Sequence, residues 1–116
     1  MATPTVIRMW GSLRDGVREP TGEAEGALYI GRAMSMAGWR LSASKWANPF
    51  KVGRDGTLEE VLTKYRAHVL ARPELVAALP ELAGRRLACW CRAPPGSNKK
   101  SHTCHGDVLV ELFTAQ

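Results

Sequence analysis

Long apolar runs are missing from this chain of 116 residues. No stretch approaches the roughly 20 consecutive apolar residues that a membrane-spanning helix needs, so we expect no membrane segment. Residues 1–5 also lack the basic residue and the following apolar run that mark a secretory signal peptide. Together these absences predict a cytoplasmic protein.

Cysteine is scarce as well, with three residues in the chain, all of them between positions 89 and 104. An odd number of cysteines in a reducing compartment argues against a disulfide framework and favours metal binding or thiol chemistry. The sequence also shows no internal repeat and no coiled-coil heptads, which excludes repeat proteins and long helical rods.

The chain does contain enough apolar residues, 45% of the total, to fold as one globular domain over residues 1–116. Its 16 basic and 11 acidic residues give a net charge of +5. That charge favours an anionic partner, either a phosphate-bearing small molecule or a nucleic acid. Because the basic residues are spread along the sequence, a basic domain without such a partner is an equal alternative.

The first third of the sequence predicts two strands separated by an irregular segment. Residues 5–10 are rich in strand formers, and the apolar residues 27–30 end at Gly31 and Arg32. Residues 11–26 contain four glycines and no apolar period, which indicates a loop or mobile segment. Arg32 is well placed at a strand end for an anion contact, although an ordinary turn with a solvated arginine explains it equally well.

Residues 42–50 predict a loop that carries binding groups, because Pro49 keeps Asn48 out of helical geometry. Lys45 and Asn48 are candidate ligand contacts in this loop. Trp46 can either stack on a nucleobase or pack beneath the loop, and packing is the commoner fate of a single tryptophan.

The rest of the sequence predicts three helices and one further strand. Thr57 and Glu60 form a capping box at the start of the first helix, and Pro73 fits the first turn of the second. The apolar face of the first helix comprises Leu58, Val61, Leu62, Tyr65 and Val69. Residues 87–91 indicate a strand and residues 106–114 a final helix. The order of elements predicts an α/β fold, a small parallel or mixed sheet flanked by helices.

The cysteines mark the strongest candidate site. On a strand, Cys89 and Cys91 point to one face and Trp90 to the other. Cys104 and His105 come just before the last helix, whose N-terminus favours a thiolate and attracts an anion. We therefore expect the strand end and the helix start to meet.

Three chemistries fit this cluster, and the first is a metal site. A Cys3His set that suits tetrahedral zinc comprises Cys89, Cys91, Cys104 and His105. His102 is an alternative to His105. Only one residue separates the first two cysteines, whereas common zinc knuckles have two, so the spacing leaves the zinc open.

The second chemistry is catalysis, in which His105 and Asp107 act as acid, base or orienting groups beside Cys104. The third is purely structural: the cysteines are small buried residues, and Asp107 complements the dipole of a helix that Thr103 caps. We favour a structural role for Cys89 and a functional role for Cys104, His105 and Asp107.

Several segments in a fixed order carry a family resemblance. They are residues 29–32 (YIGR), 44–50 (SKWANPF), 65–66 (YR), 82–84 (LAG), 89–91 (CWC) and 104–109 (CHGDVL). In these motifs the chain resembles the domain of unknown function 4326 family, over about residues 27–113. The resemblance implies a small stand-alone domain found in bacteria and in phages or other viruses, and it implies no established activity.

We expect the strand ends, the loop and the helix start to assemble one site, because ligands of open α/β sheets bind at the carboxyl ends of strands. Its members would be Arg32, Lys45, Trp46, Asn48, Cys91, Cys104, His105 and Asp107. Cations, an amide and a helix N-terminus suit a phosphate-bearing ligand, which favours an enzyme or sensor for a nucleotide or related metabolite. A zinc-stabilised nucleic-acid-binding module and a protein-interaction factor without chemistry are the alternatives.

Overall fold

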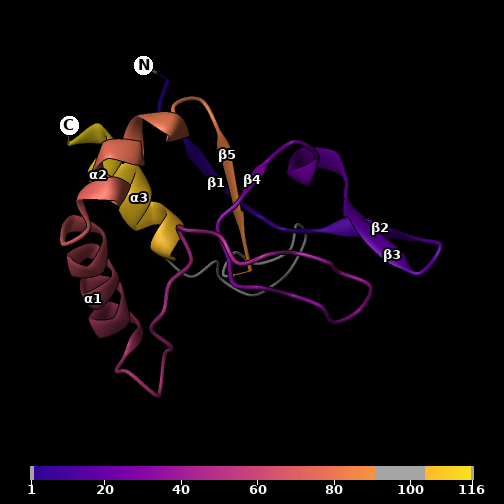
Figure 1. The fold of residues 1–116 in the computed structure, drawn as a ribbon, viewed down its shortest axis with the longest axis horizontal. Helices are drawn as coiled ribbons and strands as arrows, with labels where there is room; N and C mark the ends of the chain where they lie inside the picture. The colour runs from indigo at the N-terminus through magenta and orange to yellow at the C-terminus, as the bar shows by residue number, and fades with distance from the viewer. Residues whose placement is uncertain (1, 91–103, 116) are drawn as a thin grey trace.

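The protein is described here from a computed structural model, which describes residues 2–90 and 104–115. Within these residues, the central sheet has the strand order β1 (Thr5–Arg8), β5 (Arg86–Cys89), β4 (Leu28–Tyr29). Both pairings are parallel, so the three strands end at the same edge. The expected α/β fold with a small parallel or mixed sheet is confirmed (Figure 1).

The helices gather on one face of the sheet. They are α1 (Leu58–Leu70), α2 (Pro73–Ala78), the 3-10 turn η2 (Leu79–Leu82) and α3 (His105–Thr114). Helix α3 packs on β1 and β5, and α1 packs on both α2 and α3. Figure 1 shows this helical layer on one side and the β2–β3 hairpin projecting from the other. No helix in the described ranges is long and apolar enough to cross a membrane.

The local sequence signals for the starts of α1 and α2 are confirmed. The Thr57 hydroxyl accepts a hydrogen bond from the Glu60 amide at 3.2 Å, and the Glu60 carboxylate accepts one from the Thr57 amide at 3.1 Å. Pro73 is the first residue of α2. The expected cap of α3 is wrong, because Cys104 rather than Thr103 is its N-cap and Thr103 lies outside the described residues.

The expected loop over residues 11–26 is also wrong, because β2 (Gly11–Arg14) and β3 (Val17–Pro20) pair as an antiparallel hairpin. The 3-10 turn η1 (Gly22–Ala24) follows them. The two residues that join the strands, Asp15 and Gly16, have φ values of 52° and 79°. Two consecutive left-handed residues are the mark of a tight hairpin turn, and Asp-Gly is a preferred sequence for it.

The strand β5 separates two apolar clusters. Leu87 and Cys89 point into the main core under the helices, whereas Ala88 and Trp90 lie against the second cluster. The Trp90 ring meets the edge of Trp39 at a centroid distance of 5.4 Å. The expected opposite orientation of Cys89 and Trp90 is therefore confirmed, while Cys91 lies outside the described residues.

Candidate functional site

A cavity of about 410 Å³ opens where the parallel strands β4 and β5 end. Aromatic side chains from both strand ends and from the following loop line it: Tyr29, Phe50 and Trp90. Polar and cationic groups at the same cavity are Arg32, Asn48 and Lys51. Cys89, Cys104 and His105 also border it, so the strand end and the start of α3 meet as expected.

His105 is fixed in one orientation by the end of the sheet. Its side chain is 5% exposed, and Nε2 lies 2.7 Å from the Ile30 carbonyl oxygen. Because a carbonyl only accepts, Nε2 carries the proton and Nδ1 has the lone pair in the neutral ring. The Tyr65 ring packs edge-on against the imidazole at 5.1 Å.

The pKa of His105 is lowered, chiefly because burial disfavours the charged imidazolium. The hydrogen bond to Ile30 opposes this shift, and the positive charge of Arg32 adds to it. At neutral pH the ring is therefore neutral, with Nδ1 as a proton or hydrogen-bond acceptor. A neutral imidazole can act as a general base. Protonation of the ring would place a positive charge in a buried site, which is unfavourable.

Cys89 and Cys104 lie side by side, with their sulfur atoms 3.2 Å apart. Both are buried, and the Cys104 sulfur accepts a hydrogen bond from the Gly106 amide at 3.3 Å. Two members of the predicted zinc set are thus together, but Cys91 lies outside the described residues. Among the residues that the structure describes, no group of three or more His, Cys, Asp or Glu side chains is arranged for a metal. Zinc stays a prediction.

Asp107 does not line the cavity that His105 borders. Its carboxylate accepts a hydrogen bond from the Cys104 amide at 2.8 Å and completes the cap of the helix. It borders a separate groove between α1 and α3, together with Glu59 and Arg66. The structure therefore does not bring His105 and Asp107 to one cavity, and the observed role of Asp107 is capping.

Of the three predicted ligand contacts in the loop of residues 44–50, only Asn48 borders the cavity. Trp46 is 1% exposed and packs in the main core, where its carbonyl accepts a hydrogen bond from the Tyr65 hydroxyl at 2.7 Å. Lys45 forms an exposed ion pair with Glu81 at 2.8 Å. Asn48 does border the cavity, and its side-chain oxygen accepts a hydrogen bond from the Phe50 amide at 3.0 Å.

Residues 16–115 match the profile of a known family, Domain of unknown function (DUF4326). The chain belongs to this family. The match begins inside the β2–β3 hairpin, earlier than the residue 27 at which we expected the resemblance to start. The chain is also 34% identical over 113 residues to "Uncharacterized protein R718" of Acanthamoeba polyphaga mimivirus, covering 97% of this chain and 82% of that protein. No solved structure matches.

Arg32 joins a strand end to the loop in this DUF4326 domain. Its guanidinium donates to the carbonyl oxygens of Asn48 at 3.0 Å and Phe50 at 2.8 Å. These bonds use two of the five N–H groups of the side chain. Arg32 thus fixes the cavity wall through these two hydrogen bonds. The alternative of an ordinary turn with a solvated arginine does not describe this arrangement.

Among the cavity residues that sequence reasoning missed are three aromatic residues and one cation, namely Tyr29, Phe50, Trp90 and Lys51. Two of them are linked, because Trp90 Nε1 donates to the Tyr29 hydroxyl at 2.8 Å. Lys51 directly follows the 42–50 segment, so its neighbourhood was a usable signal. The pairing of Tyr29 with Trp90 joins residues that are distant in sequence and left no local signal.

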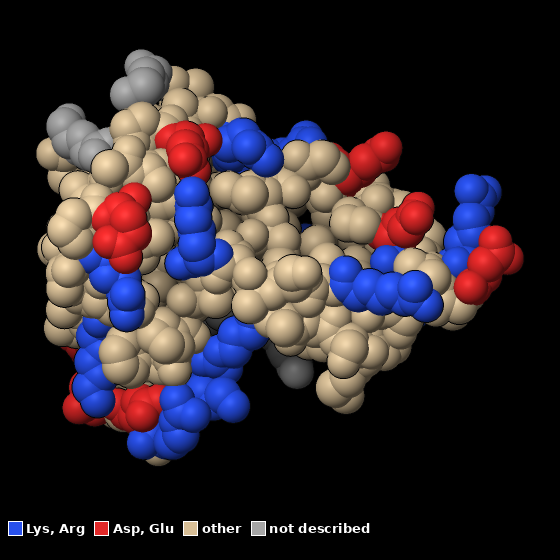
Figure 2. All heavy atoms as spheres, viewed as in Figure 1, with Lys and Arg blue, Asp and Glu red and all other residues tan. Residues whose placement is uncertain are grey.

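Basic side chains concentrate around the loop that follows Pro49. Arg54 donates to the Pro49 carbonyl, Lys64 donates to the Asp55 carbonyl, and Lys51 precedes both in the chain. Figure 2 shows several Lys and Arg residues at the lower end of the visible face, near the loop before α1, with acidic residues beside them. Of these three basic residues, Lys51 also lines the cavity.

Proposed function

We propose that this DUF4326 domain binds a small ligand that combines a phosphate group with a flat ring, such as a nucleotide. The observation that carries the proposal is the cavity at the ends of β4 and β5, where aromatic walls and two cations share one space. Ligands of open α/β sheets bind at this edge. The volume of about 410 Å³ is in the usual range for small-molecule sites.

Lys51 is the best-placed phosphate contact. Its ammonium group has no hydrogen bond or ion pair with any side chain that the structure describes, whereas Lys45 is paired with Glu81. Arg32 adds a second positive charge at the same cavity. Charge-assisted hydrogen bonds to phosphate are the strong ones, so these two residues support an anionic ligand.

The rest of the cavity suits an aromatic or heteroaromatic body. Tyr29, Phe50 and Trp90 supply ring surfaces, and Asn48 supplies an amide at the wall. His105 offers a hydrogen-bond acceptor at Nδ1, because Nε2 donates to the sheet. Any proton transfer at this site would fall to His105, since Asp107 borders a different groove.

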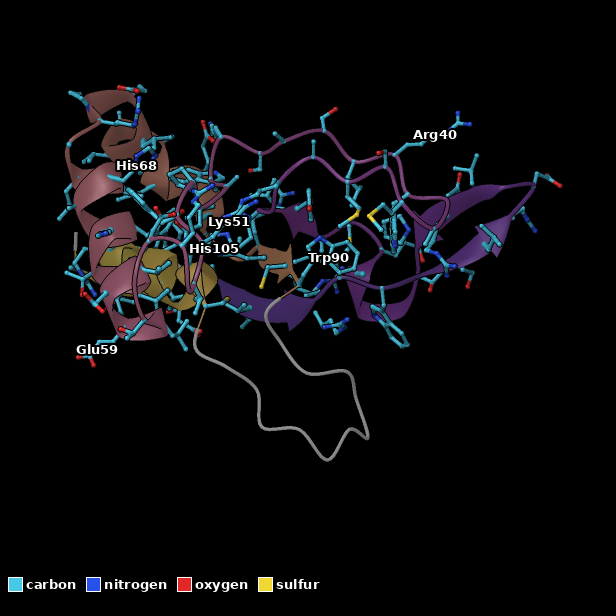
Figure 3. The ribbon with its side chains drawn as sticks, turned by 90° about the horizontal axis from the view of Figure 1, so that it is seen from below. Arg40, Lys51, Glu59, His68, Trp90 and His105 are labelled. Carbon is cyan, nitrogen blue, oxygen red and sulfur yellow. The ribbon has the colours of Figure 1, made fainter. Side chains whose placement is uncertain are left out.

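Calorimetric titration tests the proposal with the four nucleoside 5′-monophosphates, the matching nucleosides and inorganic phosphate. In Figure 3, Lys51 lies beside His105, whereas Arg40 lies on a distant loop. We expect Lys51→Gln to weaken binding of one or more nucleotides about tenfold, because a hydrogen bond to a charged group contributes about 1.5–3 kcal/mol. The matched charge-removing control, Arg40→Gln, should leave the affinity unchanged.

Nucleosides separate the two parts of the site, because they keep the ring and lack the phosphate. Their weaker binding should be the same in wild type and in Lys51→Gln. Equal losses in Lys51→Gln and Arg40→Gln would show a diffuse charge effect. That result, or no nucleotide binding at millimolar concentration, would refute the proposal.

A further inference from the structure

The buried pair Cys89 and Cys104 connects two separate elements, and both residues line the cavity. Cys89 is the last residue of β5, and Cys104 is the N-cap of α3. Their sulfur atoms are 3.2 Å apart, while a disulfide bond is about 2 Å long. A relative movement of roughly 1 Å would therefore bring the sulfurs to bonding distance.

We propose that Cys89 and Cys104 are a peroxide-sensitive pair that forms a disulfide and is restored by reduction. The proposal is independent of the ligand discussed above. It rests on the distance between the sulfurs, on the surroundings of Cys104 and on access through the cavity.

Cys104 is the residue of the pair that reacts first. The Gly106 amide donates to its sulfur at 3.3 Å, and the sulfur sits at the N-terminus of a ten-residue helix. An N–H donor and a positive helix end both favour the thiolate, the nucleophilic form of cysteine. Cys89, whose sulfur lies 3.2 Å from that of Cys104, is then the resolving thiol of the pair.

Access to the pair is restricted by size. Both residues are only 1% exposed, yet both border the cavity of about 410 Å³. Hydrogen peroxide is little larger than water and fits through such a space, whereas a tripeptide disulfide is far bulkier. Peroxide is therefore the class of oxidant that this site selects.

The chemistry balances with one molecule of hydrogen peroxide. The Cys104 thiolate attacks one peroxide oxygen, so an S–O bond forms, the O–O bond breaks, and the departing hydroxide leaves as water with the thiol proton. The Cys89 thiolate then attacks the Cys104 sulfur, so the S–S bond forms and the S–O bond breaks. The second hydroxide leaves as water with the Cys89 proton. Two thiols are oxidised and one peroxide is reduced to two waters.

The test uses the full chain with Cys91→Ser, which leaves two thiols. The protein is treated with hydrogen peroxide, alkylated without reduction, and mapped by mass spectrometry. We expect the loss of two hydrogen atoms, loss of both alkylation sites, and a cross-linked peptide that joins Cys89 to Cys104. Dithiothreitol should restore both sites.

A second variant distinguishes the roles of the two sulfurs. Cys104→Ser, combined with Cys91→Ser, keeps an N-cap oxygen and removes the attacking thiol. Its circular dichroism spectrum should match that of Cys91→Ser, and Cys89 should stay alkylatable after peroxide treatment.

Three outcomes would overturn the proposal. In the first, both thiols of Cys91→Ser remain alkylatable at peroxide doses that oxidise free cysteine. In the second, wild-type protein forms its cross-link through Cys91. In the third, the purified protein contains stoichiometric zinc that must be removed before Cys89 or Cys104 reacts.

Discussion

Acidification should destabilise the protein through His105. The buried ring is neutral in the folded state and has a lowered pKa, whereas in the unfolded chain it titrates near the usual value of about 6.5. Below that value the unfolded state therefore binds one proton more than the folded state. The contribution of His105 to stability is present above about pH 6.5 and is lost as the pH falls below it.

The size of the effect follows from one proton. Each pH unit over which only the unfolded state is protonated costs about 1.4 kcal/mol of unfolding free energy. Between pH 7.5 and pH 5.5, the expected loss from His105 is therefore up to about 1.4 kcal/mol. His68 adds to the slope with the same sign, because burial and the nearby Arg72 lower its pKa as well.

Urea denaturation at several pH values measures this loss, and matched variants assign it. Glutamine places its amide nitrogen about where histidine has Nε2, so His105→Gln keeps a donor for the Ile30 carbonyl. We expect the stability of His105→Gln to vary less between pH 7.5 and 5.5 than that of wild type, by about 1 kcal/mol. The control, His68→Gln, makes the same exchange at a half-buried position and should flatten the curve less.

The reasoning would be refuted by parallel pH curves for wild type and His105→Gln. It would also be refuted by a wild type that gains stability on acidification over this range. Either result would mean that the folded protein accommodates the imidazolium, and that the neutral ring assigned above is wrong.

Three further substitutions test the packing around the site. Tyr65→Phe leaves the buried carbonyl of Trp46 without its hydrogen bond and should lower the unfolding free energy by about 1–3 kcal/mol, measured by urea denaturation. Gly106→Ala should destabilise by about 1 kcal/mol despite its better helix propensity, because the added methyl would lie 3.0 Å from both methyl carbons of Val6; thermal denaturation checks it. Thr57→Ala removes one half of a capping box and should cost about 1 kcal/mol, with helical circular dichroism as the readout.

Local signals predicted the elements that depend on neighbouring residues. The Thr57 capping box, Pro73 at the first helical position and the apolar stripe of α1 were all readable, because each involves residues within one or two turns. The β2–β3 hairpin was missed because its local signals were incomplete. Its Asp15-Gly16 turn was visible, but its strands lack the alternating apolar pattern, and Arg18 holds β3 instead through the Ala37 and Gly11 carbonyls.

The candidate site was predictable in place but not in detail. The meeting of Cys104 and His105 with a strand end followed from chain order and parallel pairing. The bonding partners of the cations could not be predicted in this way, because they depend on tertiary structure. Lys45 forms an ion pair with Glu81, and Arg32 donates to two backbone carbonyls. Asp107 was assigned to catalysis as one option and to the helix dipole as another, and its hydrogen bond agrees with the second.

The central position of β5 has a consequence for synthesis. In the described sheet, β1 and β4 each pair with β5 and not with one another, although β5 is the last of the three strands in the chain. A nascent chain that has not reached Arg86 therefore contains both edge strands, β1 and β4, and lacks the central strand with which they pair. Long-range pairings of this kind form late and slowly. The apolar face that later receives α3 must stay open until almost the whole domain has been translated, which is the period when a chaperone would matter most.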